Sequence, residues 1–141
     1  MTPRPGRANA GAVKTLPPYA QLLQLRTEDR DGTLRFIMPF NDDVVGRPGF
    51  LHGGAIAGLL EFAAFTALSR ALDDEAVAMK PITVTVDYMR GGTPRDTYAE
   101  ALIERLGKRV ANVEAFAWQG ERDKPIASAR INFLLDRPSS R

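Results

Sequence analysis

At 141 residues, with 44% apolar and 26% charged side chains, the chain has the size and composition of one globular domain, and not of two domains or of a disordered or fibrous protein. The formal net charge of +2 arises in the terminal segments, because residues 15–135 hold 14 basic and 16 acidic side chains in alternation, which argues against nucleic-acid binding. The absence of cysteine excludes disulfides and a thiol nucleophile, and a single histidine argues against a metal site, so catalysis would rest on carboxylates, hydroxyls or backbone dipoles.

The N-terminal segment shows no hydrophobic periodicity. Residues 1–14 are rich in proline, glycine, alanine and basic residues, which predicts a mobile arm, and they lack the apolar core of a signal peptide, so we expect a cytoplasmic protein. The domain is expected over residues 15–136, with a C-terminal tail over 137–141. It begins with a predicted short helix over residues 19–25, a polar stretch over 27–32 and a first strand over 33–40.

A long helix is predicted next, over residues 54–72, after a loop rich in glycine and proline. About 18 residues would give a helix ~27 Å long. Its side chains are apolar nearly all round, which predicts burial in the core. A membrane span is the competing interpretation, but Gly58 and Glu61 interrupt the run and the strands that follow can bury it, so we expect no membrane contact.

Four segments follow the helix, and in each of them apolar residues alternate with other residues. This alternation predicts antiparallel strands that are covered on one side. Small alanines on their apolar faces would let the helix approach closely. The chain therefore predicts an α+β fold with about five strands wrapped around one long helix. The outer face carries Phe116, Trp118 and Leu134, and this apolar patch predicts a homo-oligomer.

Gly53 and Gly54 stand at the predicted start of the long helix. Amide groups at a helix N-terminus have no intrahelical acceptor, and the helix dipole favours an anion there. Because glycine has no Cβ, a substrate carbonyl can approach the backbone closely. The pair therefore predicts an oxyanion hole, with a simple tight turn as the alternative.

Glu61 is the only ionisable residue between Gly54 and Leu68. A carboxylate on a buried helix is either a functional group or a member of an ion pair, for example with Arg90 or Arg130. Gly54 and Glu61 lie on nearly the same helix face but ~10.5 Å apart along the axis, whereas catalytic contacts need about 3 Å. Two antiparallel copies of the helix would bring the glycines of one chain beside Glu61 of the other, which predicts a site shared across at least a homodimer.

The His52-Gly53-Gly54 segment, with Glu61 nine positions after the histidine and the strand over residues 84–90, resembles the PaaI-like group of hotdog-fold acyl-CoA thioesterases. The resemblance covers roughly residues 30–135. It implies a hotdog fold, a homodimer or homotetramer, and hydrolysis of short or medium acyl-CoA, or of aryl-acyl-CoA, to free acid and CoA. No cofactor is implied apart from the CoA of the substrate.

The same resemblance implies roles for individual residues. Glu61 would be the nucleophile or the general base for water, and the amides at the glycine entrance, Gly53 above all, would stabilise the oxyanion. His52 would orient the thioester carbonyl or the loop, and a structural histidine is the alternative. The residues expected to contact CoA or the rest of the substrate are Arg90, Gly107, Lys108, Arg109 and Thr83.

Two positions depart from the family pattern. Many relatives carry Asn or Gln six positions before the histidine and Ser or Thr four positions after the acid, where this chain has Gly46 and Phe65. The candidate replacements are Asn41, Thr66 and Thr83. Two other functions stay open: a hydratase or dehydratase acting on enoyl-CoA, which would use the histidine and the carboxylate as acid and base, and an acyl-CoA-binding protein without activity.

Overall fold

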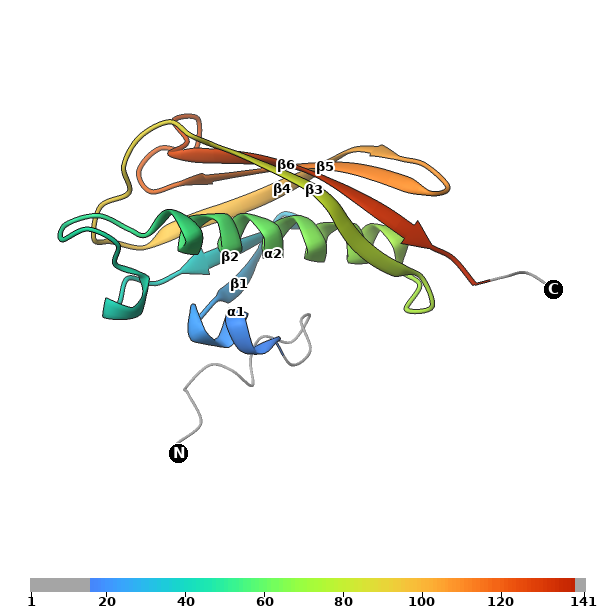
Figure 1. The fold of residues 1–141 in the computed structure, drawn as a ribbon, viewed down its shortest axis with the longest axis horizontal. Helices are drawn as coiled ribbons and strands as arrows, with labels where there is room; N and C mark the ends of the chain where they lie inside the picture. Colours follow the sequence, from blue (N-terminus) through green and yellow to red (C-terminus); the bar gives the residue numbers. More distant parts are fainter. Residues whose placement is uncertain (1–15, 139–141) are drawn as a thin grey trace.

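The computed structural model describes residues 16–138 (Figure 1). The arm expected over residues 1–14 and the last three residues of the expected tail lie outside the described residues. In chain order the elements are α1 (Pro18–Leu22), β1 (Arg26–Arg30), β2 (Thr33–Met38), a 3-10 turn η2 (Asp42–Val44), α2 (Gly53–Leu72), β3 (Ala78–Tyr88), β4 (Thr97–Leu106), β5 (Val110–Trp118) and β6 (Ala127–Asp136).

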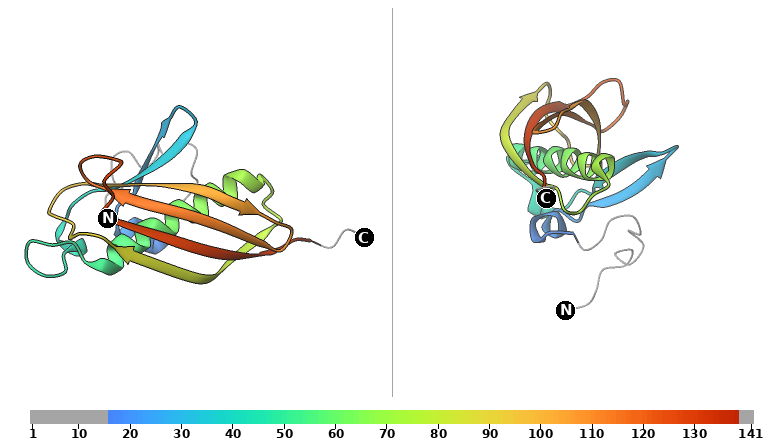
Figure 2. Two further views of the ribbon diagram at one scale, coloured as in Figure 1. Left: turned by 90° about the horizontal axis from the view of Figure 1, so that it is seen from above. Right: turned by 90° about the vertical axis from the view of Figure 1, so that its right-hand side faces the viewer.

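The strands form one antiparallel sheet of six strands in the order β1-β2-β4-β5-β6-β3. Seen along the helix, the sheet curls over α2, and α1 lies on the opposite side of that helix (Figure 2). This is the hotdog arrangement predicted from the sequence, with one strand more than expected. The additional strand, β1, occupies part of the segment predicted as a polar stretch and pairs only with β2.

The core lies between α2 and the concave face of the sheet. The positions of β5 and β6 that were predicted to face the helix are buried, and alanine occupies most of those nearest the middle of the sheet. Each leucine or isoleucine that α2 buries against this face contributes roughly 1.5–3 kcal/mol. The buried positions in these two strands include Ala111, Val113, Ala115, Ala117, Ala127, Ala129, Ile131 and Phe133.

The prediction that α2 is buried all round is wrong. One strip of its surface is exposed and carries Gly54, Glu61, Phe65 and Ser69. The sheet covers one side of the helix and α1 packs against it at Gly58, but no described element covers the strip between them. By length and composition alone α2 could also cross a membrane, yet its remaining faces pack on the sheet and on α1, as in a core helix.

The strand β3 forms one edge of the sheet and borders this open strip. Its apolar residues were predicted to face the helix, but Ile82 is 56% exposed and Val84 38% exposed. An edge strand of this length with free backbone groups and exposed apolar side chains is a template for pairing with another chain.

The outer-face patch was predicted at Phe116, Trp118 and Leu134. Its two aromatic residues are covered within the chain, whereas Leu134 is 39% exposed. The guanidinium of Arg35 lies 4.9 Å from the centre of the Trp118 ring, and that of Arg122 lies 5.0 Å from the centre of the Phe116 ring. Trp118 is consequently buried and Phe116 half-buried. These two residues therefore do not support the prediction of an oligomer, and the surface that does is the edge formed by β3 and the exposed strip of α2.

Candidate active site

The chain reaches α2 through a tightly held corner. The amide of His52 donates to the Val44 carbonyl (2.8 Å), and the amide of Gly46 donates to the Phe50 carbonyl (3.0 Å). A Cβ added to Gly46 would lie 3.0 Å from the Cα of His52, so a side chain there would require the backbone of the histidine to shift. The position at which many relatives carry Asn or Gln is thus directly beside His52, and in this chain glycine lets the two segments pack together.

His52 is the N-cap residue of α2. Its Nδ1 accepts a hydrogen bond from the Gly54 amide (2.9 Å), and its carbonyl accepts from the amides of Ala55 and Ile56. A neutral imidazole that accepts at Nδ1 carries its proton on Nε2. Because the residue is exposed, this Nε2–H is available as a donor to a bound substrate.

The two glycines at the start of α2 differ in what their amides do. The Gly54 amide is occupied by the histidine ring, and a Cβ at Gly54 would lie 2.9 Å from that ring, so glycine is needed there for the cap. No acceptor for the Gly53 amide lies among residues 16–138, and a Cβ at Gly53 would meet the chain no closer than 3.4 Å, an ordinary contact. Packing therefore does not require glycine at position 53, and the missing Cβ leaves the backbone open to close approach.

Tyr88, at the end of β3, is a site residue that sequence reasoning did not single out. Its hydroxyl donates to the Gly53 carbonyl (2.8 Å), and its ring lies against Gly53. The peptide group between Gly53 and Gly54 is held at both ends, because its carbonyl accepts from Tyr88 and its amide donates to His52. Each of these two hydrogen bonds polarises the peptide group and so strengthens the other hydrogen bond. The hydroxyl thereby fixes the peptide that follows the free amide.

Glu61 lies two turns along α2 from Gly54 on the exposed strip. The premise that this carboxylate is buried is therefore wrong for a single chain. Neither Arg90 nor Arg130 pairs with it, and among the described residues it has no hydrogen bond or ion pair. The expected alternative of an intrachain ion pair is thus not found, and the carboxylate faces outward beside the β3 edge.

The three candidate replacements for the missing polar groups lie apart from Glu61. The side-chain oxygen of Asn41 caps the η2 turn by accepting from the Asp43 amide (2.8 Å). Thr83 is exposed on β3 and Thr66 is half-buried on α2. No hydrogen bond in the described part of the chain joins any of them to the carboxylate.

The predicted CoA-binding residues divide into two groups within one chain. Lys108 and Arg109, in the turn between β4 and β5, line a cavity of about 430 Å³ together with Lys80 and Arg137, neither of which was predicted. Gly107 stands at the rim, where its carbonyl and that of Lys108 accept from the Arg137 guanidinium (3.4 and 2.9 Å). Arg90 follows the other end of β3, roughly 30 Å away along the sheet.

Together these contacts make the start of α2 a preorganised site for a developing negative charge. The free Gly53 amide, the Nε2–H of His52 and the positive end of the helix dipole all stand within two residues of one another. Within residues 16–138 no cluster of three or more His, Asp or Glu side chains is placed to hold a metal ion. A carboxylate acting on a carbonyl held by backbone and imidazole donors is the chemistry this arrangement supports.

Comparisons with known proteins find solved structures of similar fold. A protein of Chromobacterium violaceum is 40% identical over 86% of this chain and 85% of that one, with a TM-score of 0.68. A Bacillus halodurans protein solved with CoA shares 22% identity over 95% of this chain and 88% of that one (TM-score 0.79). A Pseudomonas aeruginosa thioesterase, solved as a glutamine-to-alanine mutant, shares 25% identity over 96% of this chain and 95% of that one (TM-score 0.76).

No curated protein sequence matches the chain. Its residues 48–126, which run from the loop before His52 to the start of β6, match the family model described as the thioesterase superfamily. This match covers more than half of the sequence and includes His52, Gly53, Gly54, Glu61 and Tyr88, whereas Asn41, Gly46 and Arg137 lie outside it. The chain belongs to the thioesterase superfamily.

Proposed function

We propose that the protein hydrolyses acyl-CoA thioesters as a PaaI-like thioesterase, in a homodimer whose sites combine the α2 entrance of one subunit with Glu61 of the other. The observation that carries the proposal is the Gly53 amide. It stands at the N-terminus of α2 beside a histidine donor, and it has no acceptor among the described residues. Membership of the thioesterase superfamily supports the reaction class.

Two surfaces that border each other support the proposed dimer. The β3 edge and the exposed strip of α2 lie side by side, and both carry groups that a single chain leaves uncovered. Antiparallel pairing of two β3 edges would extend the sheet and set the two α2 helices side by side. Glu61 of one subunit would then face the free Gly53 amide of the other.

In this site the thioester carbonyl oxygen accepts from the Gly53 amide and from Nε2 of His52. Glu61 removes a proton from water, the resulting hydroxide attacks the carbonyl carbon, and the oxyanion is stabilised by the two donors. When the intermediate collapses, the C–S bond breaks and the proton passes from the carboxyl group to the CoA thiolate. Direct attack by the carboxylate, through an anhydride that water then hydrolyses, uses the same groups.

The same dimer unites the two groups of basic residues. Antiparallel β3 strands place the Arg90 end of one subunit beside the Lys80 end of the other, next to Lys108 and Arg109. Arg90 of one subunit would then join Lys80, Lys108, Arg109 and Arg137 of the other, and such a group of cations suits the phosphates of CoA. The structural likeness to a protein solved with CoA supports this assignment.

The test is the release of free thiol from a panel of acyl-CoA and aryl-acyl-CoA esters by the purified protein. Hydrolysis of at least one ester is expected, and Glu61→Gln should remove nearly all of it while the variant stays folded. The exposed position of Glu61 makes this substitution structurally mild. Tight binding of acyl-CoA without turnover would instead favour a binding protein, and loss of enoyl-CoA absorbance would favour a hydratase.

A further inference from the structure

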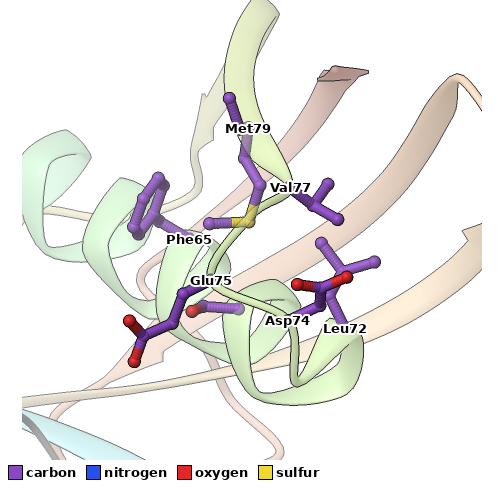
Figure 3. Close-up of a pocket in the computed structure, with 8 residues that line it drawn as sticks. Phe65, Leu72, Asp74, Glu75, Val77 and Met79 are labelled. Carbon is purple, nitrogen blue, oxygen red and sulfur yellow. The ribbon is translucent and has the colours of Figure 1, made fainter. Parts of the chain in front are cut away.

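The two ends of β3 are held in different ways. At its start, the connection from α2 is held by apolar packing, because Val77 is buried and Leu72 and Met79 pack against the core (Figure 3). The tip of the loop that follows its other end, residues 93–95, has no such packing, because all three side chains are exposed. The position of this loop therefore depends on polar contacts.

The side chain of Gln119 supplies these contacts. It follows β5 directly and is only 8% exposed. Its Oε1 accepts from the Thr93 amide (3.0 Å). Its Nε2 lies within hydrogen-bonding distance of the carbonyls of Thr93 (2.9 Å) and Arg95 (3.3 Å) and of the hydroxyl of buried Thr97 (3.1 Å). Because a backbone amide can only donate and a carbonyl can only accept, position 119 needs an acceptor and a donor on one group, which is what a carboxamide provides.

The loop that Gln119 holds contacts the segment through which the chain enters α2. The Gly92 carbonyl accepts from the Leu51 amide (2.9 Å). A Cβ added to Gly92 would lie 2.9 Å from Cδ1 of Leu51, so the two segments are in close contact. Leu51 directly precedes His52, whose Nδ1 accepts from the first turn of α2 and whose Nε2–H is the proposed donor to the substrate. A displacement of the loop would therefore be passed on to the imidazole.

We propose, on the basis of the proposed thioesterase function, that Gln119 is a positioning residue of the active site. Its side-chain hydrogen bonds all go to residues 93–97 and not to the candidate site. It acts by holding the Gly92 carbonyl where it fixes Leu51, and thereby directs the Nε2–H of His52 at the thioester carbonyl. A misplacement of about 1 Å, caused by a substitution far from the chemistry, can cost about 10²-fold in rate.

The experiment replaces Gln119 by glutamate, which keeps the acceptor for the Thr93 amide but turns the donor into an oxygen that faces two carbonyls. On an acyl-CoA ester that the wild type hydrolyses, kcat should fall about tenfold. KM should stay within about twofold, because an oxyanion donor acts mainly in the transition state. Gln24→Glu, the same chemical change at a half-buried position between α1 and β1, is the matched control and should change neither value.

A loss of folded protein would also lower kcat, so two further measurements separate positioning from stability. In a His52→Asn background, asparagine keeps the helix cap but lacks the imidazole donor, and the effect of Gln119→Glu should shrink to within about twofold. His52 is the only histidine in the chain, so imidazole signals in the NMR spectrum of the untagged, ¹⁵N-labelled protein come from this residue. The neutral ring should be protonated at Nε2 in the wild type and in Gln24→Glu, and should be a mixture of both tautomers in Gln119→Glu.

Thr97→Val keeps the shape of the side chain and removes one acceptor of the Gln119 Nε2, so it should lower kcat about threefold to fivefold. It replaces Gln119→Glu should that variant fail to fold. An unchanged kcat, an equal loss in both backgrounds, or an unchanged His52 spectrum would overturn the positioning role and leave the proposed function standing. A wild-type protein that releases no thiol from any ester would overturn the proposed function and this inference with it.

Discussion

Single residues at the start of α2 differ in what each can contribute. The Gly54 amide stabilises the histidine ring, which leaves the Gly53 amide as the backbone donor for an oxyanion. His52 is the N-cap, so Gly53 occupies the first helical position, where proline is tolerated because its missing N–H has no intrahelical partner. The extended backbone of His52 also suits a residue that precedes proline. One substitution can therefore delete the proposed donor without breaking the helix.

We predict that Gly53→Pro lowers kcat by about 10²–10³-fold, the usual cost of removing one oxyanion-hole donor. The free energy of unfolding, measured in urea, should change little. Gly53→Ala keeps the amide and adds a methyl group at an ordinary contact distance, so it should keep most of kcat while raising KM. A proline variant with wild-type kcat would show that the amide does not contact the reacting carbonyl.

Tyr88 acts on the same peptide from outside the helix. Tyr88→Phe removes only the hydroxyl that donates to the Gly53 carbonyl, and the loss of one such hydrogen bond, roughly 1 kcal/mol, predicts a kcat about fivefold lower with KM nearly unchanged. Steady-state kinetics on one acyl-CoA ester, which gives kcat and KM separately, checks this prediction. Tyr98→Phe, on the outer face, is the control. An unchanged kcat, or a rise in KM alone, would contradict a positioning role.

The sequence was informative about the site where its residues are close along the chain. His52, the two glycines and Glu61 share one helix, so helix geometry alone predicted their faces and the distance between them. Tyr88 is 35 residues from Gly53, and Lys80 and Arg137, which are 57 residues apart in the sequence, meet because the start of β3 pairs with the end of β6. Such contacts depend on strand register, which a single sequence does not define. The exposure of Glu61 was missed because the sequence of an apolar helix does not show which of its faces the rest of the chain covers.

Among the secondary-structure elements, β1 is the strand that could not be predicted from the pattern of apolar residues. Its residues, Arg26–Arg30, are polar and none is buried, so they carry no hydrophobic alternation. The signal that could have found it is the pair Asp31-Gly32, which has positive φ at both residues and joins β1 to β2. An Asp-Gly pair is a typical two-residue hairpin turn. The long helix and the other strands were predictable because each buries one regular face.

The outer face of β4 carries Glu100, the one charged residue that is buried among the described residues. The Glu100 carboxylate accepts from Arg35 (3.0 Å) and from Arg122 (2.6 Å), and its side chain is only 4% exposed. Glu100→Ala leaves two guanidiniums facing each other over Trp118 and should destabilise the fold by about 2–3 kcal/mol. The expected loss is below the ~3–5 kcal/mol of a fully buried pair, because Arg122 can turn to solvent.

Denaturant unfolding followed by far-UV circular dichroism checks this value. Glu104→Ala, on an exposed position of the same strand, is the matched control and should change the free energy of unfolding by less than about 0.5 kcal/mol. Equal stability of the two variants would mean that the Glu100 ion pairs contribute nothing to the fold.

At the scale of the whole molecule, the single chain contains all the groups of the proposed reaction but separates them. Glu61 is about 10.5 Å along α2 from the glycine entrance, and Arg90 is at the opposite end of the sheet from Lys108. Both separations would close in the proposed antiparallel dimer, in which the two surfaces that the described chain leaves open would meet. The central claim is therefore that each active site needs two subunits.

A heterodimer of two inactive subunits tests this claim most directly. Subunits carrying Gly53→Pro and subunits carrying Glu61→Gln are given different affinity tags, co-expressed, and purified through both tags in turn. In a shared site, one of the two sites of the heterodimer carries both defects and the other carries none, so thiol release should recover to about half of the wild-type rate. If each site lies within one chain, every subunit has a defect, and a heterodimer no more active than its parents would contradict the account.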